Sequence, residues 1–562
     1  MTDNEQNVRN TEGRDNGFAP AGTPAFDAAE NPCLSAGAPS TGGGGFPPYP
    51  YYAPYKRPEQ DEILEHTSTR RAFAVVLLCW LFGVLFSGIL LRGGFGLSVP
   101  LLTALFYAVA FFCFAKKRPL SRESVALLAP IGLLSLGFAL HDNGMVYFVN
   151  ILLLLALIPL QLTRMSGTSA GPVFSVQSAL HTVISALARP LEYLDTPFKA
   201  LSRNIRSGMK GSRAFIVLLG LVIALPVAAV LTALFVQADS AFGYFYKRLA
   251  DIIDLSFANL FLDILIGTVI GIFVSAWFIT MRARKSPEPK ELRLPRGADG
   301  LLTATVLVVI NAVVLSFVAV QFSYLFAGVA LPNGMTYAEY ARSGFFELCA
   351  ALCVCVAIVV ACMIFTRKDA QKKLPRPVSL LLTLFIACNY VIIASAVYRM
   401  LTYIGQFDLT VKRVMVTWLI GVFALCLIGA AIKAWLPRFD ALRYAAVVVI
   451  ALSVAVNAVN INAFIAEYNV TSYLESLKTD RVRDIDVDYL GALGPSAAEA
   501  TLRLYREGDD AVRQSAKTAL EEQKWHLVRK SWKNACLPDV EAKGLLAEFE
   551  PKKRAPENEA NG

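Results

Sequence analysis

Several charged residues stand close to the ends of long apolar stretches, where an ionised group needs a partner. They are Asp239, Glu339, Arg342, Glu347, Arg399, Asp408, Arg413 and Glu467. Such a set could form internal ion pairs, a ligand or ion site, or an acid–base catalyst. We interpret it as a structural or ligand-binding polar network, in which the carboxylates neutralise Arg399 and Arg413, and we assign no catalytic residue.

Asp263 is an ionisable residue that falls inside an apolar stretch. A carboxyl group deep in a bilayer must be protonated or paired. We therefore predict Asp263 as a candidate intramembrane coupling residue, with a solvated position near the end of the stretch as the alternative. Uncharged polar residues in other stretches, such as Asn389 and Asn457, are typical of hydrogen bonds between helices.

The sequence gives little support to a serine nucleophile or to a metal site. Gly167-Thr-Ser-Ala-Gly171 matches the spacing of a nucleophile elbow, but that motif needs a preceding strand and an Asp/His pair. Most of the ten cysteines lie in apolar stretches, and the four histidines are not clustered. Zinc sites usually combine Cys and His at short spacing, so we predict no metal and no cofactor.

The elements that position these residues are long apolar stretches. The chain has 562 residues, of which 55% are hydrophobic and 17% charged, against about 25% charged in soluble domains. The predicted spans are 72–91, 97–115, 124–140, 145–162, 214–235, 260–281, 301–325, 345–366, 378–398, 414–435 and 444–465. A helix of about 20 residues crosses the hydrocarbon layer. We therefore predict an all-α integral membrane protein with about 11 transmembrane helices.

The distribution of Lys and Arg predicts the orientation. These residues crowd every second connection between the stretches, as in 116–122, 164–213 and 282–296. Lys and Arg favour the cytoplasmic side, so we place the N-terminus in the cytoplasm and the C-terminus outside. The net charge of +9 then reflects topology rather than nucleic-acid binding. The charged set named above falls at or near the outer surface.

Composition divides the chain further. Residues 1–65 form a Gly/Pro-rich cytoplasmic tail that we expect to be disordered, with a Pro/Tyr run at 47–55 that is either a spacer or a polyproline ligand. Residues 66–465 form the polytopic membrane domain. Residues 466–550 predict a small helical extracytoplasmic domain, with helices near 486–493, 496–506, 509–532 and 538–548, and residues 551–562 a second disordered tail.

The cytoplasmic connection 163–213 contains an amphipathic segment. Apolar residues recur at three- and four-residue steps between Val173 and Leu201, and basic residues lie on or after this segment. Such a helix either lies at the anionic inner leaflet or packs against the underside of the bundle.

Several motifs resemble a known family. They are QADSAF at 237–242, FSYLF at 322–326, TYAEYARSGFFEL at 336–348, YRMLTYIGQFDLTVKRV at 398–414 and NINAFIAEYNVTSYL at 460–474. Together they resemble the uncharacterised bacterial membrane family DUF4153/DUF4173, over about residues 200–500. The resemblance implies a multi-pass protein of the bacterial plasma membrane and brings no activity.

The sequence therefore favours a non-enzymatic sensor, scaffold or assembly component with a polar outer face. The alternative is a transporter or channel for a small solute or ion, whose path would be lined by the polar residues within the spans. The expected partners are the lipid bilayer and a protein bound through the C-terminal domain or the N-terminal tail, without nucleic acid.

Overall fold

The computed structural model describes residues 69–114, 121–168, 171–206, 257–283, 297–325, 345–479 and 483–547, with parts of 220–245. Every regular element with bounds in these ranges is a helix, and one bridge joins Ala298 to Thr366. The helices are α2 (Thr69–Phe86), η1 (Ser87–Leu91), α3 (Ser98–Phe114), α4 (Arg122–Leu140), α5 (Gly144–Ser166), α6 (Val176–Val183), η2 (Ile184–Ala188), α7 (Arg189–Glu192), α8 (Thr196–Arg206), α11 (Phe257–Ala283), α12 (Gly300–Leu325), α14 (Phe345–Phe365), α15 (Arg376–Phe407), α16 (Val411–Trp435), α17 (Ala441–Asn457), α18 (Ile461–Ser476), α19 (Val487–Ala492), η4 (Gly494–Ala497), α20 (Ala498–Glu507), α21 (Asp510–Arg529), η5 (Trp532–Asn534) and α22 (Leu537–Leu545).

Eight helices in the described residues are long and apolar enough to cross a membrane. They are Arg70–Leu91, Arg122–Leu140, Gly144–Ser166, Leu262–Arg282, Gly300–Gln321, Glu347–Phe365, Arg376–Phe407 and Val411–Trp435. A ninth span results if α17 and α18, which bend by 59° at their junction, are counted as one. The predicted span 97–115 corresponds to the shorter apolar helix Ser98–Phe114, and 214–235 lies largely outside the described residues. The count of 11 remains a prediction.

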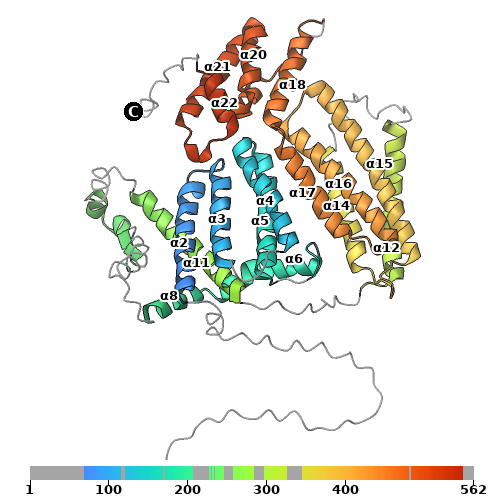
Figure 1. The fold of residues 1–562 in the computed structure, drawn as a ribbon. Coiled ribbons are helices and arrows are strands. Elements are labelled where there is room, and N and C mark those ends of the chain that lie inside the picture. The colour runs from blue at the N-terminus through green and yellow to red at the C-terminus, as the bar shows by residue number, and fades with distance from the viewer. Residues whose placement is uncertain are drawn as a thin grey trace, which may run out of the picture. The chain divides into compact units, whose positions relative to one another are not determined.

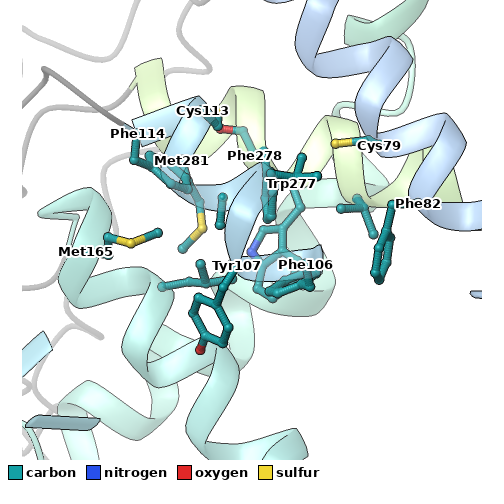
Figure 2. Close-up of a cluster of buried hydrophobic side chains, with 14 of the residues drawn as sticks. Cys79, Phe82, Phe106, Tyr107, Cys113, Phe114, Met165, Trp277, Phe278 and Met281 are labelled. Carbon is teal, nitrogen blue, oxygen red and sulfur yellow. The ribbon is translucent and has the colours of Figure 1, made fainter. Parts of the chain in front are cut away.

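Helices α2, α3, α4, α5 and α11 share one hydrophobic cluster (Figure 1). Gly267 and Gly271 lie one turn apart on α11, and the backbone of α2 at Trp80 and Val84 stands where their side chains would be. Small residues at this spacing let membrane helices approach closely. In Figure 2 the aromatic rings of α3 and α11 fill the neighbouring space, with the centroid of Phe106 5.3 Å from that of Phe278.

Helices α12, α14, α15 and α16 share a second cluster, which includes Leu307, Leu352 and Phe385. Helix α17 contacts α16 on one side and α4 and α5 on the other. It therefore joins the first group of helices to the second.

The C-terminal helices pack on α18. Asn460 caps α18 by accepting a hydrogen bond from the amide of Ala463 at 3.1 Å, and the buried face of α18 enters a cluster with Leu490, Leu493 and Leu504. Helices α19, α20, α21 and α22 lie close to the four helices predicted for this region. The predicted boundary at 465/466 falls inside α18, and the division into domains remains a prediction.

The connection predicted as amphipathic is helical from α6 to α8. Helix α6 contacts α5, α7 contacts α11, and α8 contacts α2 and α11. Large apolar side chains nevertheless remain exposed along it at steps of three and four residues, at Val176, Leu180, Val183, Leu187, Leu191, Leu194 and Phe198. One face thus packs on the bundle, while the other presents an apolar stripe.

Candidate functional site at the α18–α22 end

Two asparagines join α5 to α17 within the apolar bundle. Asn150 and Asn457 are 0% and 4% exposed, and each donates to the amide oxygen of the other, at 2.7 and 2.9 Å. Gly137 of α4 makes room, because the oxygen of Asn457 stands where a Cβ at that position would be. A reciprocal amide pair satisfies polar groups that would be costly if buried alone.

The α4–α5 loop continues this polar contact toward the C-terminal helices. His141 Nε2 lies 2.6 Å from the carbonyl oxygen of Asn457, at the break between α17 and α18. Asn143 caps α5 through Met145 N at 3.0 Å and donates to Asn462 Oδ1 at 2.6 Å. Asn462 donates in turn to the carbonyls of Asp142 and Leu493, at 2.6 and 3.0 Å. One side chain of α18 thus links the loop to the start of the C-terminal helices.

Lys530 forms a second link between the loop and the C-terminal helices. Its Nζ lies 3.1 Å from Asp142 Oδ2 and 2.9 Å from Asp539 Oδ1. Asp539 is buried and accepts from the amide of Cys536 at 2.7 Å. Burial alone would lower the pKa of Lys530. The carboxylates of Asp142 and Asp539 outweigh burial, and the pKa of the lysine is raised. We define Asp142, Lys530, Cys536 and Asp539 as the lysine cluster.

The lysine cluster also holds three groups of metal-ligating type. One ligand atom each from Asp142, Cys536 and Asp539 lie within 4.8 Å of one another. A cysteine binds metal as the thiolate, yet burial, followed by a hydrogen bond to Asp539, raises the pKa of Cys536 to about 12. The ammonium group of Lys530 already supplies a cation to both carboxylates. The donor set therefore suits an internal ion pair better than a metal.

Asp263, the predicted coupling residue, is paired where α11 meets the end of α2. It forms an ion pair with Arg92 and accepts from Ser87 Oγ at 3.1 Å. Lys533 of the C-terminal helices donates to the carbonyl of Gly88 at 2.9 Å in the adjacent turn. Arg92 thus neutralises the carboxylate of Asp263, next to the contact between Lys533 and Gly88.

Arg399 and Arg413 have different partners. Arg399 is buried and donates to Gln321 Oε1 at 3.0 Å, where Ser395 donates to the same oxygen at 2.9 Å. Arg413 donates to the carbonyls of Phe407, at 2.6 Å, and Asp408. The contacts of Arg413 therefore include backbone oxygens as well as the ring of Tyr403, 4.1 Å from its guanidinium carbon.

The α15–α16 loop is held in a strained form at Asp408. This residue has φ +60°, which a non-glycine residue adopts at a cost of about 1–3 kcal/mol. Asn469 of α18 clamps the loop by bonding both the amide and the carbonyl of Leu409, at 2.9 and 3.0 Å. Burial raises the pKa of Asp408, although Arg483, 3.7 Å away, and Arg413 lower it in part.

An open groove of about 1010 Å³ lies between the end of α15 at the α15–α16 loop and helix α18. We call it the α18 groove. Its lining comprises Gly405, Gln406, Phe407, Phe464, Glu467, Tyr468, Thr471, Ser472, Glu475, Ser476, Thr479 and Arg483. Phe464 and Tyr468 are 53% and 38% exposed. Glu467 accepts from Arg503 Nη1 at 2.6 Å. Aromatic and acidic side chains thus share one exposed helix face.

The predicted charged set is distributed over several elements. Asp408, Arg413 and Glu467 come to the corner between α15, α16 and α18, and Arg399 lies in α15. Glu347 is exposed in the first turn of α14, and Asp239 is exposed and bonds the amides of Ala241 and Phe242 in its own turn. Glu339 and Arg342 lie outside the described residues.

Sequence reasoning did not identify the residues that connect the loop, α18 and the C-terminal helices. These are Asp142, Asn143, Asn150, Asn462 and Lys530. One signal was available, because Asn150 is one of two amide residues, with Gln161, in the apolar helix α5. Asn462 falls inside the predicted span 444–465, and the other three lie in segments whose polarity is ordinary for a loop or a surface helix.

The family model for a domain of unknown function, DUF4153, matches residues 128–504. The chain belongs to the DUF4153 family. This confirms the resemblance to DUF4153 drawn from the sequence motifs. The DUF4153 region includes Asn150, Asn457, Asp408 and the α18 groove, and it ends before Lys530. No curated protein and no solved structure matches the chain.

Proposed function

We propose that this DUF4153 protein is a non-enzymatic sensor or scaffold of the bacterial cytoplasmic membrane, with α18–α22 outside the cell. A protein partner binds along the α18 groove. The observation that carries this proposal is the exposed face of α18, where Phe464, Glu467, Tyr468 and Glu475 line one open groove.

The chemistry of the groove favours a basic, amphipathic segment of a partner. Aromatic side chains such as Phe464 and Tyr468 are enriched at protein interfaces. Glu475 is exposed in the groove and is available to attract a cation. Glu467 has a partner in Arg503 on its own chain, so it contributes less charge to an incoming segment.

A fixed position of the C-terminal helices supports a docking role. Lys530 and Asn462 bond them to the α4–α5 loop, and Lys533 bonds them to η1. A surface that is already ordered loses little conformational entropy when it binds. A partner would therefore meet α18 in its bound form, and its binding would act on the loop and the helix ends together.

Pairing of the polar residues gives less support to the transport alternative. A coupling residue must exchange its ion or proton, whereas Asp263 is bound to Arg92 and Ser87. Asn150 and Asn457 satisfy each other instead of facing a solute path. These contacts are what a structural role requires.

Photocrosslinking from two positions tests the proposal. A photoreactive amino acid replaces Tyr468 in the groove or, as the control, Val528, an exposed residue of α21. In growing cells, Tyr468 should capture one reproducible protein that Val528 does not capture. The purified partner should then bind the full-length protein in nanodiscs.

Charge reversal provides the decisive comparison. Glu475→Lys should weaken binding of the captured partner by about tenfold or more, whereas Glu522→Lys, an exposed change on α21, should leave it unchanged. Equal capture from both positions, or equal affinity for both variants, would contradict a partner site in the groove.

A further inference from the structure

Basic and aromatic residues gather at the end of α21 and in η5. Between 524 and 538 the chain carries four basic residues, two tryptophans and no acidic residue. The six are Lys524, Trp525, Arg529, Lys530, Trp532 and Lys533. Segments that lie in the plane of a membrane typically combine Lys and Arg with Trp and aliphatic residues. The composition of this segment therefore suits a membrane surface.

Hydrogen bonds place η5 at the end of a crossing-capable helix (Figure 1). Lys533 Nζ donates to the carbonyl of Gly88 at 2.9 Å. That helix ends at Leu91, about 4.5 Å further along at 1.5 Å per residue. The amide of Leu97 donates to the carbonyl of Ala535 at 3.0 Å, just before α3 begins. Helix η5 therefore lies over the turn where the chain leaves one apolar helix and enters the next.

Glycines in this turn let η5 pack directly on the backbone. A Cβ atom on Gly96 would lie 2.5 Å from the carbonyl carbon of Asn534, and one on Gly93 would lie 2.9 Å from Cβ of Lys533. Both distances are too short for a larger residue unless the neighbouring atoms shift. The close contact and the two hydrogen bonds together hold η5 at one depth relative to the helix ends.

Large apolar side chains are exposed on both partners of this contact. Leu91 and Leu97, at the helix ends, are 58% and 40% exposed. Trp532 and Leu537, on either side of the residues that bond the turn, are 57% and 48% exposed, and we call these two residues the Trp532 edge. The edge thus presents an aromatic ring and an aliphatic side chain at the level where the crossing-capable helix ends.

We propose that the Trp532 edge, with Arg529 beside it, inserts into the anionic phospholipid surface at this end of the bundle. Indole rings prefer the headgroup level of a bilayer, which is the depth at which Lys533 holds the edge. Arg529 is exposed, with its guanidinium carbon 4.0 Å from the ring of Trp525, and anionic headgroups attract basic residues at this level. The contact depends on the helix ends it adjoins and not on which leaflet lies there.

A bilayer accounts for the exposed edge better than a partner protein does. At the level of the helix ends, the surroundings of a membrane protein are phospholipid headgroups and the first carbons of the acyl chains. A protein that matched this basic segment would need acidic side chains at the same level, where an unpaired charge is costly. Phospholipid supplies the phosphates and the apolar chains together, so one occupant satisfies both Arg529 and Trp532.

Photocrosslinking in a bilayer of known composition tests the proposal. In the full-length protein, benzoylphenylalanine replaces Trp532 or, as the control, Gln514 near the other end of α21. Both positions are exposed. The protein is reconstituted in phosphatidylglycerol nanodiscs and irradiated, and mass spectrometry measures the phospholipid adduct on each peptide. The adduct at position 532 should exceed that at position 514 several-fold. Equal yields would overturn the proposal, as would a crosslink from position 532 to a second copy of the chain.

Two further arms test the charge and the identity of the occupant. Phosphatidylcholine nanodiscs should give less adduct at position 532 than phosphatidylglycerol. Arg529→Gln should narrow this difference, whereas Arg506→Gln, an exposed change on α20, should not. Equal yields in the two lipids, or an unchanged difference in Arg529→Gln, would overturn the proposal. So would reproducible capture of a protein from position 532 in growing cells. Partner capture at Tyr468 reports on the α18 groove and is independent of these results.

Discussion

Asparagine side chains link helices that are far apart in the sequence. Asn150 and Asn457 are 307 positions apart and form a closed amide pair. Asn143 and Asn462 form another amide contact, while Asn469 holds the α15–α16 loop. In a bilayer the apolar surfaces of helices gain little by leaving lipid, so packing and interhelical hydrogen bonds carry more of the specificity.

The Asn150–Asn457 pair gives a prediction at this scale. Asn457→Leu should destabilise the folded protein by about 1–2 kcal/mol, because the amide of Asn150 is left buried without this partner. The double variant Asn150→Leu/Asn457→Leu should cost less than the sum of the two single changes. A double-mutant cycle on the free energy of unfolding in mixed micelles measures this coupling. Additive costs would show that the two amides do not act as a pair.

His181 gives a pH prediction. Burial, followed by the charges of Arg189 and Arg164, lowers its pKa to about 4 from the ordinary 6.5. The unfolded chain therefore takes up a proton that the folded chain refuses, and stability present above pH 6.5 is lost as the pH falls toward 4. The Tm should fall over this window. His181→Gln should flatten the profile, and His526→Gln, an exposed change, should not.

At the scale of elements, helix positions were largely predictable, because apolar length and caps are local properties. Eight predicted spans coincide with crossing-capable helices, and the C-terminal helices begin close to their predicted starts. The break between α17 and α18 differs from the predicted continuous span 444–465. Asn460 caps the new helix and His141 binds the carbonyl of Asn457, and the second of these contacts comes from a distant loop.

The candidate site was less predictable than the helices. Glu467, Asp408 and Arg413 stood out because charge is conspicuous beside apolar residues. In the structure Glu467 contacts Arg503, Asp408 contacts Arg483, and Arg413 donates to backbone oxygens while its charge also lowers the pKa of Asp408. Asn462 and Lys530 acquire their roles only when the chain folds, since their partners in the α4–α5 loop lie more than 300 positions away.

The lysine cluster predicts that Lys530 holds α22 against the α4–α5 loop. Lys530→Met leaves the carboxylates of Asp142 and Asp539 without their cation. Asp539 is buried but Lys530 and Asp142 are partly exposed, so the cost should be smaller than the roughly 3–5 kcal/mol of breaking a fully buried pair. Hydrogen exchange should become faster in α22 and in the α4–α5 loop, with little change in α12. Lys543→Met, an exposed change on α22 itself, is the control. Equal protection in Lys530→Met and wild type would exclude this role.

The whole molecule presents two different faces to its surroundings. The α18–α22 end carries paired charges and the open α18 groove, while the α6–α8 end carries an exposed apolar stripe. A sensor that binds a protein at one end needs its helices held in register if that binding is to act on the other end. The α17 contacts with α16, α4 and α5 connect the two groups of helices in this way.

The orientation of the chain supplies the prediction at this scale. The test uses a single introduced cysteine at one of two exposed positions. These are Gln514→Cys in α21 and Gln371→Cys in the α14–α15 connection. A membrane-impermeant maleimide should label Cys at 514 in intact spheroplasts and Cys at 371 only after lysis. The unsubstituted protein gives the background from its native thiols. The reverse pattern would place the C-terminal helices in the cytoplasm.

The short helix α3 has a consequence for the lipid that surrounds it. It has 17 residues, a length of about 26 Å at 1.5 Å per residue, and is shorter than the eight crossing-capable helices. The hydrocarbon layer is about 30 Å thick. If α3 crosses it, as the sequence predicts, the bilayer beside α3 has to thin at a cost of a fraction of a kcal/mol per Å. We therefore expect shorter acyl chains to be favoured there, and a second protein with the same shortfall would gain by settling beside α3.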